Sequence, residues 1–153
     1  EFLQLNGRSE QALAIYREIV PELFVQSMRP GTVKYPGDTV AVATALISTG
    51  QVAQAQQLLR TGIKDAAELP LGGSLGRNWS DVFAYALLGE YDNACKALAE
   101  AADNGYFQNH ALLTAYPALA GLRKQPCFEK HYARIRAQAE AQVNAARKAD
   151  LLP

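Results

Sequence analysis

The sequence predicts an all-α fold built of stacked helical hairpins, and three observations support this. A glycine followed five residues later by an alanine occurs three times, at residues 7–12, 50–55 and 89–94. An apolar stripe at helical spacing follows each of these alanines, and none of the three stripes alternates as a β-strand would. A signature repeated along a chain is typical of repeat proteins, in which each unit stacks on its neighbours.

Each signature has a physical reason. A glycine adopts the left-handed conformation that closes a helix, so it suits the turn between two antiparallel helices. The small side chains of Ala12, Ala55 and Ala94 then allow the second helix to lie close against the first. We therefore expect these alanines to be buried where two helices touch.

The elements follow in order from these turns. The first hairpin, about residues 1–24, lacks most of its first helix, and its second helix carries the apolar residues Leu13, Tyr16, Ile19 and Val20. The second hairpin, 38–67, has a first helix at 39–49 and a second with Leu58, Leu59, Gly62 and Ile63. The third, 78–104, has a first helix at 80–88 and a second with Ala97, Leu98, Ala101 and Ala102. Segments rich in Pro and Gly, 25–36 and 68–77, connect the hairpins.

A C-terminal capping segment is predicted for residues 106–149. Its last helix begins at Pro126, a residue well suited to a first helical turn, and runs to about Ala149. Phe128, Tyr132 and Ile135 should cover the last hairpin, because the end of a stack exposes apolar surface unless something caps it. Beyond Ala139 the stripe thins to small residues, so this half is either a solvated extension or the interface of a homodimer.

The spacing of these residues resembles the tetratricopeptide (TPR) repeat. The matching positions are the residue four before the glycine (Leu46, Tyr85), the alanine, a bulky residue four later (Tyr16, Leu59, Leu98) and a small one three beyond (Ile19, Gly62, Ala101). The consensus Trp and the first-helix Gly are absent, no Pro closes each repeat, and the turn glycines are 43 and 39 residues apart instead of the usual 34. The resemblance implies a right-handed superhelix of antiparallel hairpins with a long C-terminal capping helix.

The tail carries a second resemblance. The strings at 104–106, 115–123 and 125–135 resemble the segment that closes the TPR regions of bacterial multidomain signalling proteins, such as membrane-tethered winged-helix regulators and adenylate cyclases. This resemblance implies a bacterial regulatory parent protein. It places the domain either in the cytoplasm or on the outer side of the membrane.

Length and charge fit one domain covering residues 1–153. The chain has 15 basic and 15 acidic residues, so no net field attracts nucleic acid or an anionic membrane. No apolar run approaches the length of a membrane span. The sequence begins inside a hairpin and without Met, from which we expect a fragment of a larger protein.

Few residues suggest catalysis. Ser74 lies in a Gly-x-Ser-x-Gly string, the nucleophile elbow of hydrolases, but a strand should precede that motif and here a Pro/Gly-rich loop does. His110 and His131 have no Cys, Asp or Glu around them at metal-binding spacing. We therefore expect no enzyme activity, no cofactor and no metal, with a hydrolase using Ser74 as a third and weakest reading.

Cys95 and Cys127 lie on helices that could approach each other. Two buried thiols are the favoured interpretation, and a disulfide, which would indicate an oxidising compartment, is the alternative. Residues 78–80 fit a glycosylation sequon, but we interpret Ser80 as a helix N-cap followed by Asp81.

The predicted binding surface is the concave face, which the first helix of each hairpin lines. Equivalent positions place Val40, Thr44 and Ile47 beside Trp79, Phe83 and Ala86, and a Trp is typical of binding hot spots. The expected partner is a protein or peptide. The alternatives are a small-molecule sensor with a pocket near Trp79, or a C-terminal segment that folds over this face and makes Trp79 part of the core.

Overall fold

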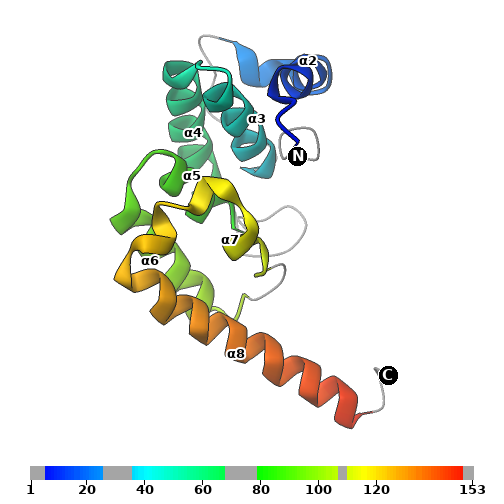
Figure 1. Ribbon diagram of the computed structural model, residues 1–153, viewed down its shortest axis with the longest axis vertical. Helices are drawn as coiled ribbons and strands as arrows, with labels where there is room; N and C mark the ends of the chain where they lie inside the picture. The colour runs from blue at the N-terminus through cyan, green and yellow to red at the C-terminus, as the bar shows by residue number, and fades with distance from the viewer. Residues whose placement is uncertain (1–5, 26–35, 68–78, 107–109, 150–153) are drawn as a thin grey trace.

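The computed structural model describes residues 6–25, 36–67, 79–106 and 110–149, and within these ranges it contains helices and turns but no strand (Figure 1). The all-α prediction is confirmed for this part of the chain. The elements are α2 (Ser9–Ile19), η1 (Pro21–Phe24), α3 (Pro36–Ser48), α4 (Val52–Ala66), α5 (Ser80–Leu87), α6 (Tyr91–Asp103), α7 (Leu112–Ala115), η2 (Pro117–Leu119), η3 (Leu122–Lys124) and α8 (Pro126–Lys148).

Two helix pairs form the body of the molecule. Helix α3 packs against α4 and α5 packs against α6, and α3 also contacts α5, so that the two hairpins stack (Figure 1). Helix α2 lies against α3 at one end of this stack, and α8 lies against α6 at the other. The arrangement agrees with stacked hairpins, while the superhelical hand implied by the TPR resemblance stays a prediction.

The three signature glycines occupy the turns for which they were predicted. Gly7, Gly50 and Gly89 have φ of +72°, +80° and +74°, the left-handed region that favours glycine. At Gly50 the glycine N–H donates to the Ile47 carbonyl and the next N–H donates to the Leu46 carbonyl. This pair of hydrogen bonds is a Schellman motif, which ends a helix by satisfying its last carbonyls.

The same motif recurs at Gly89 and, unpredicted, at Gly105. The N–H of Glu90 donates to the Tyr85 carbonyl at 2.9 Å, and that of Tyr106 donates to the Ala101 carbonyl at 2.9 Å. Gly105 has φ of +67° but no alanine five residues later, so the repeated signature does not include it. Helices α3, α5 and α6 therefore all end in a Schellman motif.

The fixed spacing to alanine follows from these turns. The residue after each glycine is the N-cap of the next helix, and its carbonyl accepts the first intrahelical hydrogen bond from the alanine N–H, at 3.0 to 3.1 Å in all three copies. The alanine thus lies in the first turn of each of the three helices. Ala12, Ala55 and Ala94 are buried, as predicted.

The apolar stripes are confirmed in α4 and α6 and only partly in α2. In α4 the backbone at Gly62 approaches Thr39 of α3 so closely that an added Cβ would lie 2.6 Å from the threonine Cγ2. Ile19, which holds the matching position in α2, is instead 63% exposed, so the stripe of α2 is buried only in part. No described helix lies over Ile19 as α3 lies over Gly62.

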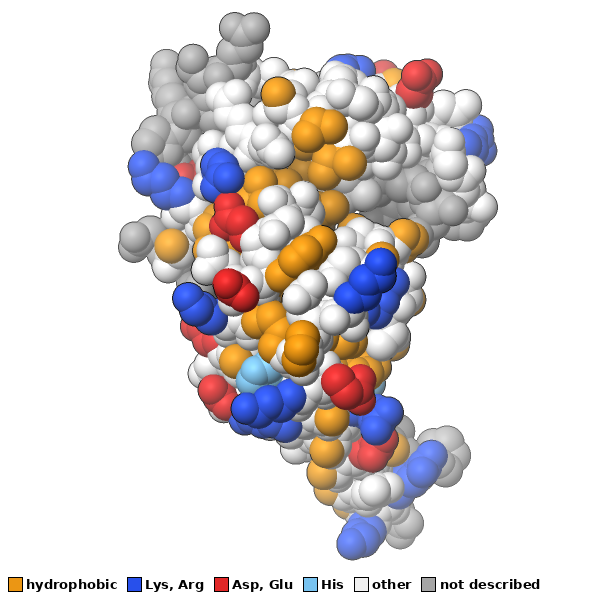
Figure 2. Space-filling model, turned by 60° about the vertical axis from the view of Figure 1, so that its left-hand side comes forward, with side chains coloured by type: hydrophobic (Ala, Val, Ile, Leu, Met, Phe, Trp, Pro, Cys, Tyr) orange, Lys and Arg blue, Asp and Glu red, His pale blue; other side chains and the backbone are white. Residues whose placement is uncertain are grey.

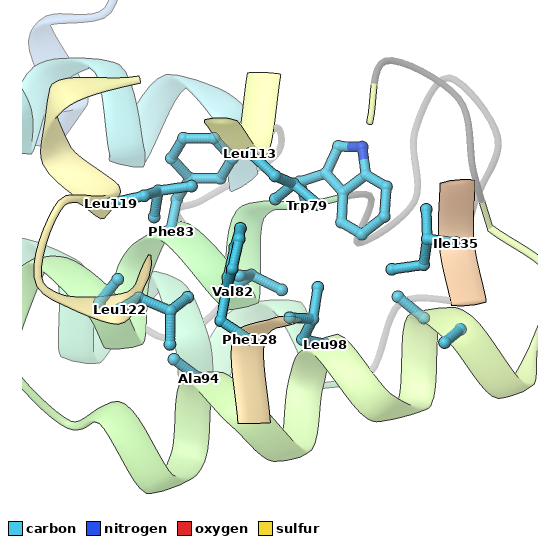
Figure 3. Packing of buried hydrophobic residues seen from close by; sticks show 13 residues of the cluster. Trp79, Val82, Phe83, Ala94, Leu98, Leu113, Leu119, Leu122, Phe128 and Ile135 are labelled. Carbon is cyan, nitrogen blue, oxygen red and sulfur yellow. The ribbon is translucent and has the colours of Figure 1, made fainter. Parts of the chain in front are cut away.

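The apolar interior consists of two clusters. One joins α2, η1, α3 and α4 around residues such as Leu13, Leu46 and Leu59. The other joins α5, α6, the segment 112–124 and α8. Figure 3 shows the side chains of Trp79, just before α5, of Leu98 in α6 and of Ile135 in α8 entering this cluster. Val40 packs against both clusters and so links the two hairpins.

Helix α8 closes the C-terminal end of the stack, as predicted. Phe128 and Ile135 are buried, and the ring of Tyr132 stacks on that of Phe128 with centroids 5.4 Å apart. The Gln138 amide donates to the Ala102 carbonyl at 2.9 Å, and Arg134 pairs with Asp103. Beyond these contacts α8 projects from the body (Figure 1).

A disulfide between Cys95 and Cys127 also fastens α8 to α6. Their Cα atoms are 6.0 Å apart, within the range that a disulfide spans. The favoured interpretation of two buried thiols is therefore corrected. The sequence placed the two cysteines near each other, but spacing alone does not show whether the sulfurs meet.

Helix α5 begins one residue after its N-cap residue, and that N-cap differs from the predicted one. Trp79, rather than Ser80, is the N-cap residue of α5, and no side-chain cap bond is made there, so the N-cap prediction is wrong by one position.

An ion pair joins the two hairpins, in which Arg60 of α4 pairs with Glu90 at 2.8 Å. A hydrogen bond from Asn93, and to a smaller extent one from Arg60, lowers the pKa of the Glu90 carboxyl.

Candidate binding face

The predicted binding residues occupy equivalent places on α3 and α5. Each lies a fixed number of residues before its turn glycine, so that Val40 corresponds to Trp79 and Thr44 to Phe83. The structure brings the two sets together, because α3 and α5 are in contact and Val40 packs against the cluster that contains Trp79. The two helices differ, however, in what covers these positions.

On α5 the face is covered by the chain itself. Trp79 and Phe83 are only 5% and 6% exposed. The Trp79 ring lies 4.8 Å from that of Tyr106, and the Phe83 ring meets Tyr116 edge to face at 5.1 Å, centroid to centroid. Their burial favours a role in the core over direct contact with a partner.

The covering segment comprises Tyr106 and residues 112–124. Leu113, Leu119 and Leu122 are fully buried, and Figure 3 shows Leu113 and Leu119 beside Phe83. The Arg123 guanidinium donates to the Tyr116 carbonyl at 2.7 Å, which fixes the bend between α7 and η2. Short helical turns thus hold this stretch against α5.

On α3 the equivalent positions are less enclosed. Val40, Thr44 and Ile47 are each partly buried. The Thr44 hydroxyl donates to the Val40 carbonyl at 2.8 Å, so its hydrogen bond is made within α3. The methyl group of Thr44 is the apolar part of this side chain. The resulting strip is mainly apolar.

Sequence reasoning missed Tyr106 and Tyr116 as residues of this face. Both lie in the strings that carried the resemblance to bacterial signalling proteins, but periodicity offers no partner for an aromatic residue outside a long helix. Burial raises the pKa of the Tyr106 phenol, as expected for a ring packed beneath other side chains.

The two histidines lie near the capping helix α8. The His110 ring lies 6.1 Å from that of Tyr132, and Nδ1 of His131 is buried without a hydrogen bond. Burial, followed by the charges of Lys130 and Arg134, lowers the pKa of His131. The described residues contain no group of three or more His, Cys, Asp or Glu able to hold a metal ion. Ser74 lies outside the described residues.

Hollows occur at other places on the surface. One of about 560 Å³ lies between the start of α2 and the end of α3, where Arg8, Glu10 and Thr49 contribute to its lining. Another of about 570 Å³ lies between η1 and α4. Neither adjoins Trp79, and the sensor pocket near that residue stays a prediction.

Surface charge is mixed on the visible face. Lys and Arg alternate with Asp and Glu over the body, and hydrophobic side chains form a line down the projecting end of α8 (Figure 2). Within the described ranges, no helix is long and apolar enough to cross a membrane.

Comparison with protein-family models, with curated proteins and with solved structures found no match for this chain. The stacked hairpins and the two faces described above are therefore the basis for any functional inference.

Proposed function

We propose that this chain is a non-catalytic interaction domain of the TPR-like class that binds a protein or peptide on the inner face of α3. The parent protein, by the resemblance of its tail, is a bacterial regulator. The proposal includes Val40, Thr44 and Ile47 as contact residues and assigns Trp79 and Phe83 to the supporting core.

The observation that supports the proposal is that a segment of this chain, residues 116–124, packs on α5, the helix equivalent to α3 in the next hairpin. Tyr116 and the short turns after it lie on α5 over Phe83, so this kind of face accepts a polypeptide by burying aromatic and aliphatic side chains. Thr44 is the counterpart of Phe83 on α3, and it is only partly buried. A second segment of similar chemistry, with an aromatic anchor, would extend the same mode of binding by one hairpin.

Selection from a displayed peptide library, followed by measurement of Kd for the selected peptides, tests this proposal. Thr44→Arg should weaken binding at least about tenfold, because it places a charge in the apolar strip. Thr61→Arg on α4 is the matched control, since the Thr61 hydroxyl also donates to the carbonyl four residues earlier.

Both variants should melt close to the parent protein. Peptides whose affinity is unchanged by Thr44→Arg but lowered by Thr61→Arg would place the binding site on the outer surface and contradict the proposal.

A further inference from the structure

The hollow between the start of α2 and the end of α3 is polar on both sides. Gly7, Ser9 and Gln11 line it from α2 and the turn before it, and Ser48 and Thr49 line it from the end of α3. Its volume of about 560 Å³ lies in the range of small-molecule sites. The hollow does not include Trp79 or the proposed contact residues of α3, so it is a separate feature of the surface.

The first turn of α2 contributes three backbone N–H groups to this hollow. They belong to Ser9, Glu10 and Gln11, which precede the first N–H that bonds within the helix, from Ala12 to the Arg8 carbonyl. Arg8, the N-cap residue, makes no side-chain cap bond to them. The positive end of the helix dipole lies at the same place. Such a helix start is suited to an oxyanion.

The Ser9 hydroxyl is an independent indication of a ligand. Ser9 lies on the same face of α2 as the buried Leu13 and is itself only 8% exposed. Among the residues that the structure describes, its hydroxyl makes no hydrogen bond. A buried hydroxyl without a partner is costly, and most have one. Because Ser9 lines the hollow, a ligand there would supply that partner.

The α3 side of the hollow does not oppose an anion. The last carbonyls of α3 accept hydrogen bonds from the N–H groups of Thr49 and of the Schellman motif at Gly50. The hydroxyls of Ser48 and Thr49 donate within α3, at 2.9 and 3.1 Å. Arg8 and Glu10, both exposed, add one positive and one negative charge to the lining. The unused donors are therefore those of α2.

We propose that this hollow binds the phosphate group of a small molecule. The three N–H groups and hydroxyl at residues 9–11, together with the Arg8 guanidinium, are the donors. A phosphate group presents three strong acceptor oxygens, one more than a carboxylate, and so suits this number of donors. The volume of the hollow exceeds what a phosphate group alone fills, and the polar remainder of the ligand lies toward Ser48 and Thr49.

Titration of the full chain with glycerol 3-phosphate and with inorganic phosphate, at constant ionic strength, tests the proposal by NMR. The amide signals of residues 9–11 should shift along a saturating curve. Residues 52–54 are the control, since α4 also starts after a left-handed glycine and without a side-chain cap bond. Tighter binding of glycerol 3-phosphate identifies a phosphate monoester as the ligand. Equal or tighter binding of inorganic phosphate identifies the free ion.

Three substitutions make the test specific to these side chains. Arg8→Gln and Ser9→Ala should each weaken binding at least about threefold, because each removes a donor. Glu10→Gln should strengthen it, since it removes a like charge next to the anion. Arg147→Gln, which removes an exposed charge from the far end of α8, is the matched control and should change nothing.

Equal shifts at residues 9–11 and 52–54 would overturn the proposal, because they would show a general effect of anions on helix starts. No shift with either probe would also overturn it. So would an Arg8→Gln variant whose affinity changes no more than that of Arg147→Gln, since the hollow would then not be the site of binding.

Discussion

The two ends of the hairpin stack differ in how they are finished. At the C-terminal end, α8, the segment 112–124 and the disulfide cover the last hairpin, and Trp79 and Ile135 are buried there. At the other end, α2 leaves Ile15 and Ile19 in solvent. Stacked hairpins bury each other's faces only in the interior of the stack, so the ends depend on additional chain. Five predictions test this contrast, from the largest expected effect to the smallest.

Replacing Trp79 with Ala should lower the free energy of unfolding by roughly 3 to 5 kcal/mol, because a buried aromatic side chain leaves a cavity. Ile19→Ala at the open end should change it by less than about 0.5 kcal/mol. Urea unfolding of both variants measures the difference. Equal losses in the two variants would mean that the ends do not differ as described.

Reduction of the disulfide should lower the free energy of unfolding by about 2 to 4 kcal/mol, since the Cys95–Cys127 bond closes a loop of 32 residues. Unfolding with and without dithiothreitol measures the loss. The double variant Cys95→Ala with Cys127→Ala is the control and should no longer respond to the reductant. A parent protein equally stable in both conditions would contradict the assigned bond.

Ala94→Leu should cost roughly 1 to 3 kcal/mol, because it overpacks the contact between α5 and α6. Ala14→Leu makes the same change on the exposed side of α2 and should be nearly neutral. Thermal unfolding compares the two. If Ala94→Leu were also neutral, the close contact at the signature alanine would not exist.

Gly89→Ala should cost about 1 to 2 kcal/mol, because alanine is strained at φ of +74°. Gly7 has nearly the same φ, but Gly7→Ala should cost less, since a helix at an open end can fray without unfolding the rest. Hydrogen exchange of α2 and α6 amides separates local fraying from global loss. Identical losses would indicate that α2 unfolds together with the whole domain.

Acidification should weaken the capped end slightly. The pKa of His131 is lowered in the folded protein, so folding favours the neutral ring. The stability that depends on it is complete above the unfolded pKa of about 6.5 and is lost as the pH falls through the lowered value. His131→Gln should flatten this part of the stability profile between pH 7.5 and 5, measured by urea unfolding. If the dependence of the unfolding free energy on pH were unchanged in His131→Gln, groups other than His131 would be responsible for it.

The turns and the covering of the last hairpin by α8 could be predicted from the sequence, and the contacts of the segment between α6 and α8 could not. Gly50 and Ala55 define a hairpin because their roles are local, within one turn and the first residues of a helix. The cover of Trp79 by Tyr106 depends on where a later segment returns, and no periodicity encodes that. The exposure of Ile19 likewise could not be read from its apolar character, because a helical stripe does not show which of its residues another segment covers.

The Schellman motifs also bear on the order of folding. Each ends a helix through hydrogen bonds between residues at most five apart, so the reversals at Gly50 and Gly89 form without help from distant chain. In the chain without the Cys95–Cys127 bond, the docking of α8 brings together residues 36 apart, as at Gln138 and Ala102, and must first close a long loop. Rapid assembly of the hairpins should therefore precede a slower step in which α8 seals the stack, and probes in α4 and α8 should report different rates.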